Sequence, residues 1–256
     1  MTLALRVLLV AVLAFLYAPI VVLVVMAFNR SALYELPIVW DTVWFEALAH
    51  NDRLLTASLN SILIALANTL VATVLGTMAA LAFARFQFRG RNLLRLMLLP
   101  PITIPWLIIG TAMLVLFFWT GIGRGLHAIL LGHVALSLPY VVIVVGARLT
   151  SFGDALEESA AVLGANPWQT FWRVSMPVIA PGVIAAALFA FAVSFDQFVI
   201  SYFLAPPGVS TLPVEIYAAI RKGFTPEVNA VSAIIIVVSM GLMLVFARLY
   251  RFGGER

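Results

Sequence analysis

Six long apolar runs constrain what this chain can fold into more than any other feature. Each run reaches the roughly 20 residues that an α-helix needs to cross the hydrocarbon core of a bilayer. In hydrocarbon, one unbroken segment satisfies its own backbone groups only as a helix. The sequence therefore predicts an all-α polytopic membrane protein with six transmembrane helices, in a single domain over residues 1–256. The runs are Leu5–Phe28, Ser58–Ala84, Leu94–Phe118, Leu126–Ala147, Val178–Leu204 and Val228–Phe246.

Composition leaves little soluble mass outside these runs. Hydrophobic residues make up 64% of the chain and charged residues 10%, whereas soluble domains carry about 25% charged residues. The absence of cysteine excludes disulfides and thiol chemistry. The first apolar stretch, from Val7 to Phe28, is too long for a typical secretory signal and is not followed by a small-residue cleavage site. We therefore expect an uncleaved first span.

The arginines predict the orientation in the membrane. If the N-terminus is cytoplasmic, ten of the fifteen basic residues fall in inside segments, as the positive-inside rule requires. Both termini and the loop between spans four and five are then cytoplasmic, and the net charge of +4 needs no nucleic-acid partner. The inside residues are Arg6, Arg85, Arg89, Arg91, Arg95, Arg148, Arg173, Arg248, Arg251 and Arg256.

Small residues and prolines mark individual spans. Pro19, Pro105 and Pro139 predict kinks in spans one, three and four. In span two, small residues recur every three or four positions, which lets helices approach closely in lipid. This pattern favours packing within the chain and leaves a subunit interface open. The small residues are Ala65, Thr69, Ala72, Gly76 and Ala80.

The cytoplasmic stretch Asp154–Pro177 is unusually polar for this chain and begins with a predicted short helix. Asp154 followed by Glu157 is a capping-box pattern. A helix is expected over Ala155–Leu163, with Gly164 as a left-handed C-terminal stop.

A second short helix is expected directly after this stop. Asn166 and Pro167 supply an N-cap amide and a proline at the first helical position. A capped pair of helices is more than a simple connection between two spans requires, because most connections are a few residues long. We therefore expect this loop to dock onto another protein, and a plain connecting loop is the alternative.

The same loop resembles the "EAA" loop of ABC importer permeases. The family pattern is Glu-Ala-Ala, three residues, Gly, nine residues and Ile-x-Leu-Pro. Here Glu158-Ser159-Ala160, Gly164 and Val174-Ser175-Met176-Pro177 match that spacing, and Ser159, Val174 and Met176 are mild departures. The resemblance covers essentially the whole chain, including the six-span layout.

In the family this loop is a coupling helix that sits in a groove of a cytoplasmic ATPase subunit. The resemblance implies that Ala155–Gly164 inserts there, with Glu158 as a polar anchor and Gly164 as the turn. It assigns the loop, residues 154–177, to coupling within the single permease domain. The residues assigned to coupling are Glu157, Glu158, Ser159, Ala160, Gly164 and Pro177.

The chain has no nucleotide-binding motif of its own. No G-x-x-x-x-G-K-[ST] phosphate loop is present, and the only lysine is Lys222. Any ATP, with its Mg²⁺, is therefore expected to be bound and hydrolysed by partner subunits. We expect neither a cofactor nor a metal site in this chain.

Within this family, the chain is most similar to the spermidine/putrescine-type permeases. The similarity lies in "SFDQFVISYFLAPPGVSTLPVEIYAAIRKGFTPEVNA" and in "WFEALAHNDRLLTASLNSI". Asp196 is the only acid inside any predicted span, and an intramembrane ionisable group is a functional-site hypothesis by default. It lies roughly 27 Å of helix beyond Val178, in the outer half of the membrane. The Asp196 carboxylate would pair transiently with a cationic solute. The side chains of Ser194 and Gln197 would hydrogen-bond to the same solute.

Other interpretations of this region stay open. Asp196 is alternatively a buried structural acid bonded to Ser194, Gln197 or a neighbouring chain. The polyamine pattern often has a second acid where Gln197 stands, and an acid where Trp106 follows Pro105. Another small solute, such as an amino-acid-like, opine or phosphonate compound, is therefore the alternative cargo. Trp44 matches an aromatic residue of the polyamine subgroup and suits cation–π contact, or it is an interfacial anchor.

The sequence argues against two further function classes. An intramembrane enzyme would need a motif such as G-x-S-x-G or H-E-x-x-H, which the chain lacks. His50, His127 and His133 have no ligand-like spacing with acids. A channel or secondary carrier would leave the docking loop unexplained and usually shows internal repeats, which are not evident. The sequence favours a transport subunit that is not an enzyme.

The resemblance also implies partners and a location. Two cytoplasmic ATPase subunits, a second related permease subunit and a periplasmic solute-binding protein are expected around a chain embedded in membrane lipid. The location implied is the bacterial inner membrane, with several spans and both termini cytoplasmic. The expected mechanism is alternating access driven by closure of the ATPase subunits.

Overall fold

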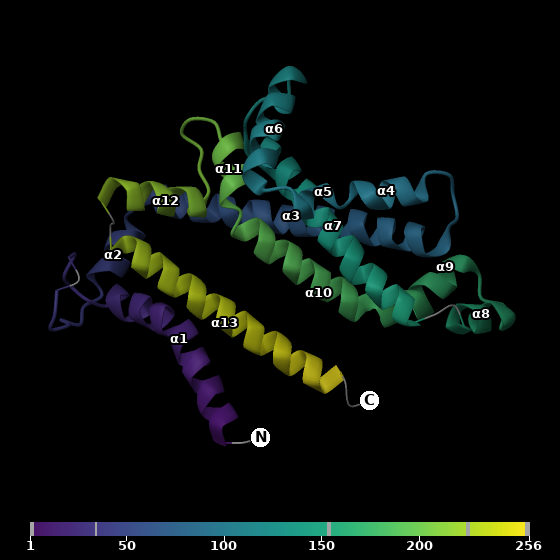
Figure 1. Cartoon of the computed structure of the whole chain (residues 1–256), viewed down its shortest axis with the longest axis horizontal. Helices are drawn as coiled ribbons and strands as arrows, with labels where there is room; N and C mark the ends of the chain where they lie inside the picture. Colours follow the sequence, from purple (N-terminus) through teal and green to yellow (C-terminus); the bar gives the residue numbers. More distant parts are fainter. Residues whose placement is uncertain (1–2, 34, 153–154, 224–225, 254–256) are drawn as a thin grey trace. The chain divides into compact units, whose positions relative to one another are not determined.

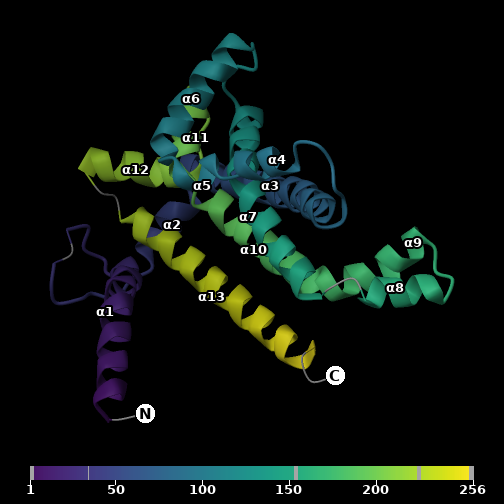
Figure 2. The same cartoon turned by 45° about the vertical axis from the view of Figure 1, so that its right-hand side comes forward.

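The computed structural model describes residues 3–33, 35–152, 155–223 and 226–253, with side chains as far as Gly241 in the last helix. The chain is built from helices (Figures 1 and 2). In the described ranges, the β-structure is an isolated antiparallel bridge between Asn29 and Trp40. The predicted all-α class is therefore confirmed. The chain divides into two compact units, Met1–Leu55 with Glu215–Arg256, and Thr56–Val214.

The first unit combines the two ends of the chain. Helix α13 (Glu227–Gly253) packs against α1 (Leu3–Ala27) and α2 (Val43–Ala49). Most of α1 is an exposed apolar surface, as expected for a helix that faces lipid. The Arg53 guanidinium lies 3.1 Å from the Glu215 carboxylate, an ion pair between the start of α3 (Asp52–Arg85) and α12 (Leu212–Gly223).

The second unit contains the central spans and the polar loop. One apolar cluster joins α3, α7 and α10 around Val141, Ile179 and Ala186. Another joins α3, α6, α7 and α11 around Ile129 and Ile200. The remaining elements of this unit are α4 (Arg91–Met97), α5 (Pro100–Thr103), α6 (Trp106–Trp119), α7 (Leu126–Phe152), α8 (Ala155–Val162), α9 (Pro167–Thr170), the π-helix η1 (Phe171–Ser175), α10 (Met176–Phe195) and α11 (Phe198–Leu204).

The small residues of α3 face the interior of the second unit. Ala65 and Ala72 are fully buried, and Ala80 is nearly so. A Cβ atom added to Gly76 would lie 2.5 Å from Cγ1 of Val141, so glycine lets α3 and α7 come into close contact. The predicted packing of this face within the chain is confirmed.

The predicted count of six transmembrane helices is not confirmed. In the described residues, four helices are long and apolar enough to span a membrane, and the count becomes five if one bent pair is a single span. These four are Leu3–Ala27, Asp52–Arg85, Leu126–Ser151 and Pro167–Phe195. The sixth apolar run begins in α13, whose portion Glu227–Gly241 is apolar but shorter.

The third apolar run is broken more sharply than a kink. Its two parts, Arg91–Thr103 and Trp106–Trp119, meet at an angle of 112°. Ile104 has extended backbone angles, φ −83° and ψ 135°, because the residue before a proline is sterically excluded from the helical region. Pro105 therefore ends one helix and begins another. Pro19 and Pro139 instead lie inside the continuous helices α1 and α7.

Candidate functional site

The first helix of the polar loop ends in a capped turn at Gly164. Gly164 has φ +85°, which confirms the predicted left-handed stop. Its N–H donates to the Ala161 carbonyl at 2.9 Å, and the Ala165 N–H donates to the Ala160 carbonyl at 3.0 Å. These two bonds form a Schellman motif that satisfies carbonyls at the end of α8. The predicted N-cap, Asp154, lies outside the described residues.

The second helix of the loop also starts as predicted. The Asn166 side chain accepts from the Gln169 N–H at 2.9 Å, and the Gln169 side chain accepts from the Asn166 N–H at 3.1 Å. This reciprocal capping box has Pro167 at the first helical position. The helix continues through the π-helical turn Phe171–Ser175 into α10, so one continuous helix covers Pro167–Phe195.

The loop presents exposed apolar and acidic side chains. Val162 and Leu163 are 87% and 88% exposed, and Trp168 is 70% exposed. Ala160 is buried in the same helix. Glu158 is also exposed and has no polar side-chain contact in the described part of the chain. Three large apolar side chains of this loop are therefore exposed to its surroundings.

Glu157 joins the loop to two of the long helices. Its carboxylate accepts a hydrogen bond from the Ser175 hydroxyl at 2.5 Å and forms an ion pair with Arg85 at the end of α3. The two side chains keep 28% and 20% of their surface exposed, so solvent still reaches this pair and screens it in part. Ser175 directly precedes α10, which carries Pro177 in its first turn. One carboxylate of α8 therefore contacts both the end of α3 and the residue that precedes α10.

No sequence pattern indicates this junction. Glu157 was expected to complete a capping box, yet its partners lie 18 and 72 positions away in the sequence. Ser159, another residue assigned to coupling, donates its hydroxyl hydrogen bond to the Ala155 carbonyl of its own helix. The structure therefore places Glu157 at the base of the loop and Glu158 on its outer surface.

The fifth apolar run is interrupted at the candidate cargo residues. Helix α10 ends at Phe195, Asp196 is its C-cap, and α11 begins after Gln197. Ser194 and Gln197 are buried, and the Gln197 side chain accepts from the Val199 N–H at 3.1 Å. Asp196 is exposed, with no hydrogen bond or ion pair from its carboxylate in the described residues. Within this chain, it does not have the buried, bonded environment that the structural alternative requires.

His133 bridges the interruption, although its sequence spacing indicated no role for it. Its Nδ1 lies 2.8 Å from the hydroxyl of Ser194 on α10, and its Nε2 lies 3.1 Å from the hydroxyl of Ser201 on α11. A neutral imidazole donates from one nitrogen and accepts at the other, so it satisfies both hydroxyls. Close by in sequence on α7, Ser137 accepts from the Asn68 side chain, which also donates to the Ala190 carbonyl. The only sequence signal was a polar residue inside an apolar run.

Aromatic rings lie on both sides of Asp196. Phe191 and Phe195 stack with centroids 5.8 Å apart before it, and Phe198 and Tyr202 lie 5.5 Å apart after it. A carboxylate flanked by aromatic side chains suits an alkylammonium ion, because ring faces attract cations and also contact methylene groups.

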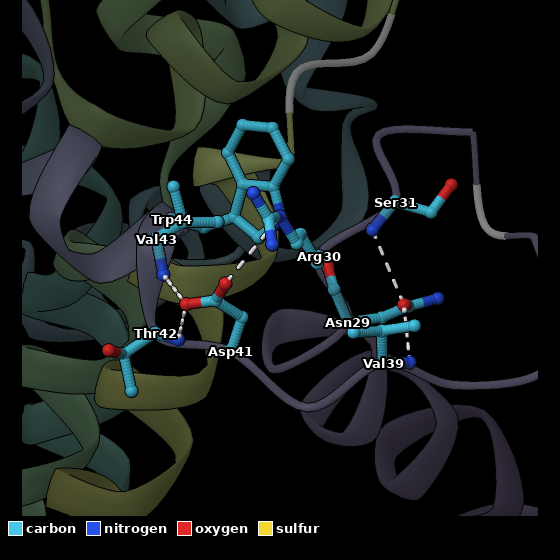
Figure 3. A network of polar contacts seen from close by, with 8 residues as sticks. All are labelled: Asn29, Arg30, Ser31, Val39, Asp41, Thr42, Val43 and Trp44. Atoms are coloured by element: carbon cyan, nitrogen blue, oxygen red, sulfur yellow. Dashed lines mark hydrogen bonds and ion pairs between the residues drawn. The ribbon is translucent and has the colours of Figure 1, made fainter.

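Trp44 belongs to the first unit and has its own polar surroundings (Figure 3). Its indole N–H donates to the Asn29 carbonyl at 2.8 Å. Asp41 accepts from the N–H groups of Thr42 and Val43 at the start of α2, and its carboxylate lies 3.7 Å from Arg30. The indole of Trp44 is therefore held in place by the loop that follows α1.

Comparisons with known proteins agree on one family. Residues 72–254 match the family described as the binding-protein-dependent transport system inner membrane component. The putrescine transport system permease protein PotI of Escherichia coli (strain K12) is 36% identical over 230 residues, which cover 87% of this chain and 82% of PotI. The spermidine/putrescine transport system permease protein PotC of Haemophilus influenzae is 35% identical over 233 residues, which cover 90% of each chain.

A solved structure supports the same fold. One chain of a bacterial alginate ABC transporter, solved in complex with an alginate pentasaccharide-bound periplasmic protein, superposes with a TM-score of 0.71 at 20% identity. The superposition covers 95% of this chain and 91% of the transporter chain. With the long family match and two relatives aligned along nearly the whole sequence, the chain belongs to the inner membrane components of binding-protein-dependent transport systems, the multi-pass permease subunits of ABC importers.

Proposed function

We propose that this permease carries a polyamine, such as putrescine or spermidine, into the cytoplasm, with Asp196 on the cargo pathway. The proposal rests on the carboxylate of Asp196, which has no polar partner among the described residues and lies at the break between α10 and α11. The names of the two similar permeases, which refer to putrescine and spermidine, point to the same cargo.

The position of Asp196 favours a role in binding over a role in stability. A carboxylate at the C-terminal end of a helix lies beside the negative end of the helix dipole, which disfavours it by about 0.3–1 kcal/mol. Asp196 occupies this position without a compensating partner in the described residues. A passing cation would be attracted both by the carboxylate and by the last carbonyls of α10, as at other interrupted membrane helices. Ser194 and Gln197 border the same break.

We further propose that the polar loop couples the spans to ATP hydrolysis. Docking of Ala155–Gly164 on a cytoplasmic ATPase subunit would cover Val162 and Leu163, and Glu158 would anchor the contact. The capped ends of the two short helices make the loop rigid, and the Glu157 junction would pass its movement to α3 and α10. Ser159, Ala160, Gly164 and Pro177 complete the coupling set.

The assembly that this role requires contains several other chains. We infer two ATPase subunits that bind Mg-ATP, a second related permease and a periplasmic solute-binding protein. The permease domain would extend over residues 1–256, with both termini in the cytoplasm. Closure of the ATPase subunits would move the coupling loops and expose the pathway alternately to the two sides of the membrane.

Reconstitution with the partner subunits and the binding protein tests the cargo. Proteoliposomes in which the ATPase subunits face the lumen are expected to accumulate labelled putrescine only when ATP is enclosed in the lumen. Unlabelled spermidine should compete with putrescine, whereas the uncharged isostere 1,4-butanediol should not, because it lacks the ammonium groups. Competition by an amino-acid-like or phosphonate solute, without competition by spermidine, would favour the alternative cargo.

Cysteine labelling in intact cells tests the orientation. The chain contains no cysteine, so Ser151→Cys and Ser210→Cys each introduce a single thiol. An impermeant reagent added outside is expected to label Ser210→Cys and not Ser151→Cys, because the arginine distribution places the polar loop inside. Ser210 is half-buried, so exposed Pro207→Cys in the same segment serves as a second outer position. Labelling of Ser151→Cys with protection of Pro207→Cys would reverse the orientation.

A further inference from the structure

A cleft of about 690 Å³ lies between α3, α4 and α7, and its lining includes neither the residues at the break near Asp196 nor those of the docking loop. Its walls combine apolar side chains with two guanidinium groups, a mixture that suits an amphiphile. The lining includes Phe83, Leu98, Val142, Leu149, Arg91 and Arg95.

The two arginines of the cleft are not neutralised. The Arg95 guanidinium donates to the Phe83 carbonyl at 2.8 Å and lies 5.5 Å from the centre of the Phe83 ring. Arg91 donates to the same carbonyl, and its Nε is buried without a hydrogen-bond partner in the part of the chain that the structure describes. Neither arginine forms an ion pair in the described part of the chain. One neutral carbonyl near the end of α3 uses few of the five donors that each guanidinium carries.

We propose that this cleft binds the headgroup of an anionic phospholipid, with the phosphate at Arg91 and Arg95 and an acyl chain along the apolar wall. Guanidinium groups bind phosphate through paired, charge-assisted hydrogen bonds. Basic pockets between membrane helices on the cytoplasmic side bind anionic lipid headgroups in this way. The cytoplasmic placement rests on the orientation proposed above. A polyamine would be repelled by the two arginines, so the cleft is a lipid site and not a second cargo site.

The charge of the neighbouring segment supports an anionic lipid. Arg85 and Arg89 lie close in sequence to Arg91 and Arg95, and positive charge at the cytoplasmic surface attracts anionic lipids. Arg85 is already paired with Glu157, whereas Arg89 is exposed and does not line the cleft. Arg89 therefore provides a matched control in the same loop.

The test measures phosphatidylglycerol binding to the purified transporter complex in zwitterionic nanodiscs. Native mass spectrometry should detect retained phosphatidylglycerol, and adding this lipid should raise the melting temperature of the complex. In the Arg91→Gln/Arg95→Gln double variant, the affinity should fall at least about tenfold and the lipid-dependent rise in melting temperature should disappear. Arg89→Gln should behave like the unaltered complex.

Two results would overturn the proposal. If the double variant lowers the melting temperature equally with and without phosphatidylglycerol and still retains the lipid, the arginines only cap α3. If inorganic phosphate alone stabilises the complex as much as phosphatidylglycerol does, the cleft binds a free anion and not a lipid. Polyamine uptake in the same nanodisc-derived complex, after transfer to proteoliposomes, reports separately on the proposed function.

Discussion

Gly164→Val is expected to abolish ATP-driven uptake while the chain stays in the membrane and keeps its spans. Gly164 has φ +85° at the end of α8, where a β-branched residue costs about 1–3 kcal/mol of backbone strain. A Cβ atom at this position would meet nothing within 4 Å, so the strain acts on the turn and not on packing. Relief of the strain would break the Schellman bonds and misdirect α8. Uptake into proteoliposomes and co-purification of the ATPase subunits measure the effect.

Two matched variants show whether the loss concerns coupling. Gly164→Asn should retain much of the uptake, because asparagine tolerates the left-handed conformation better than valine does. Gly121→Val introduces the same kind of strain in the connection between α6 and α7, where φ is +75° and the space is also open. It should transport nearly normally. Normal cargo-stimulated ATP hydrolysis in Gly164→Val, with the ATPase subunits still bound, would contradict the coupling assignment.

Asp196→Asn is expected to lower polyamine uptake at least about tenfold, the loss that follows from one charge-assisted contact in the transport pathway. The change keeps the size and most of the hydrogen-bonding capacity of the side chain but removes its charge. Stability should not fall, because the C-cap position of α10 no longer holds a carboxylate against the helix dipole. The uptake rate should therefore fall, whereas the melting temperature of the complex should not.

The control for Asp196→Asn is another exposed acid changed in the same way. Asp52→Asn lies in the first turn of α3, in a segment predicted to be outside the membrane, and is exposed. It should leave uptake nearly unchanged. Assembly and basal ATP hydrolysis should be normal in both variants. An Asp196→Asn permease that transports at the normal rate would make Asp196 structural and would remove the main residue-level argument for a polyamine.

Features set by neighbouring residues were predictable from the sequence. The end of α8 at Gly164 and the N-cap at Asn166 depend on residues within a few positions, and both were placed correctly. The apolar runs predicted where long helices lie because hydrocarbon accepts few other structures. Pro105 predicted a kink in span three. The size of the bend, 112°, also depends on how the following helix packs. Gly110 of α6 lies directly against Phe203 of α11, for example.

Contacts between distant segments were not predictable in this way. His133 meets Ser194 and Ser201, which are 61 and 68 positions away, and no spacing rule brings these residues together. The break after Phe195 was hidden for a similar reason, because apolar residues continue on both sides of Asp196 and Gln197. Only the packed helices show that one imidazole holds both sides of the break.

The continuous helix from Pro167 to Phe195 is long enough to link movements at its two ends. Its 29 residues form a lever about 44 Å long at the usual helical rise. One arm begins beside the docking loop, and the other arm ends at the cap formed by Asp196. A lever that pivots within the bilayer turns a push on its inner arm into a swing of its outer arm in the opposite direction. A force on the end of this helix at one membrane face would thus displace its other end at the opposite face, without another element to transmit the movement.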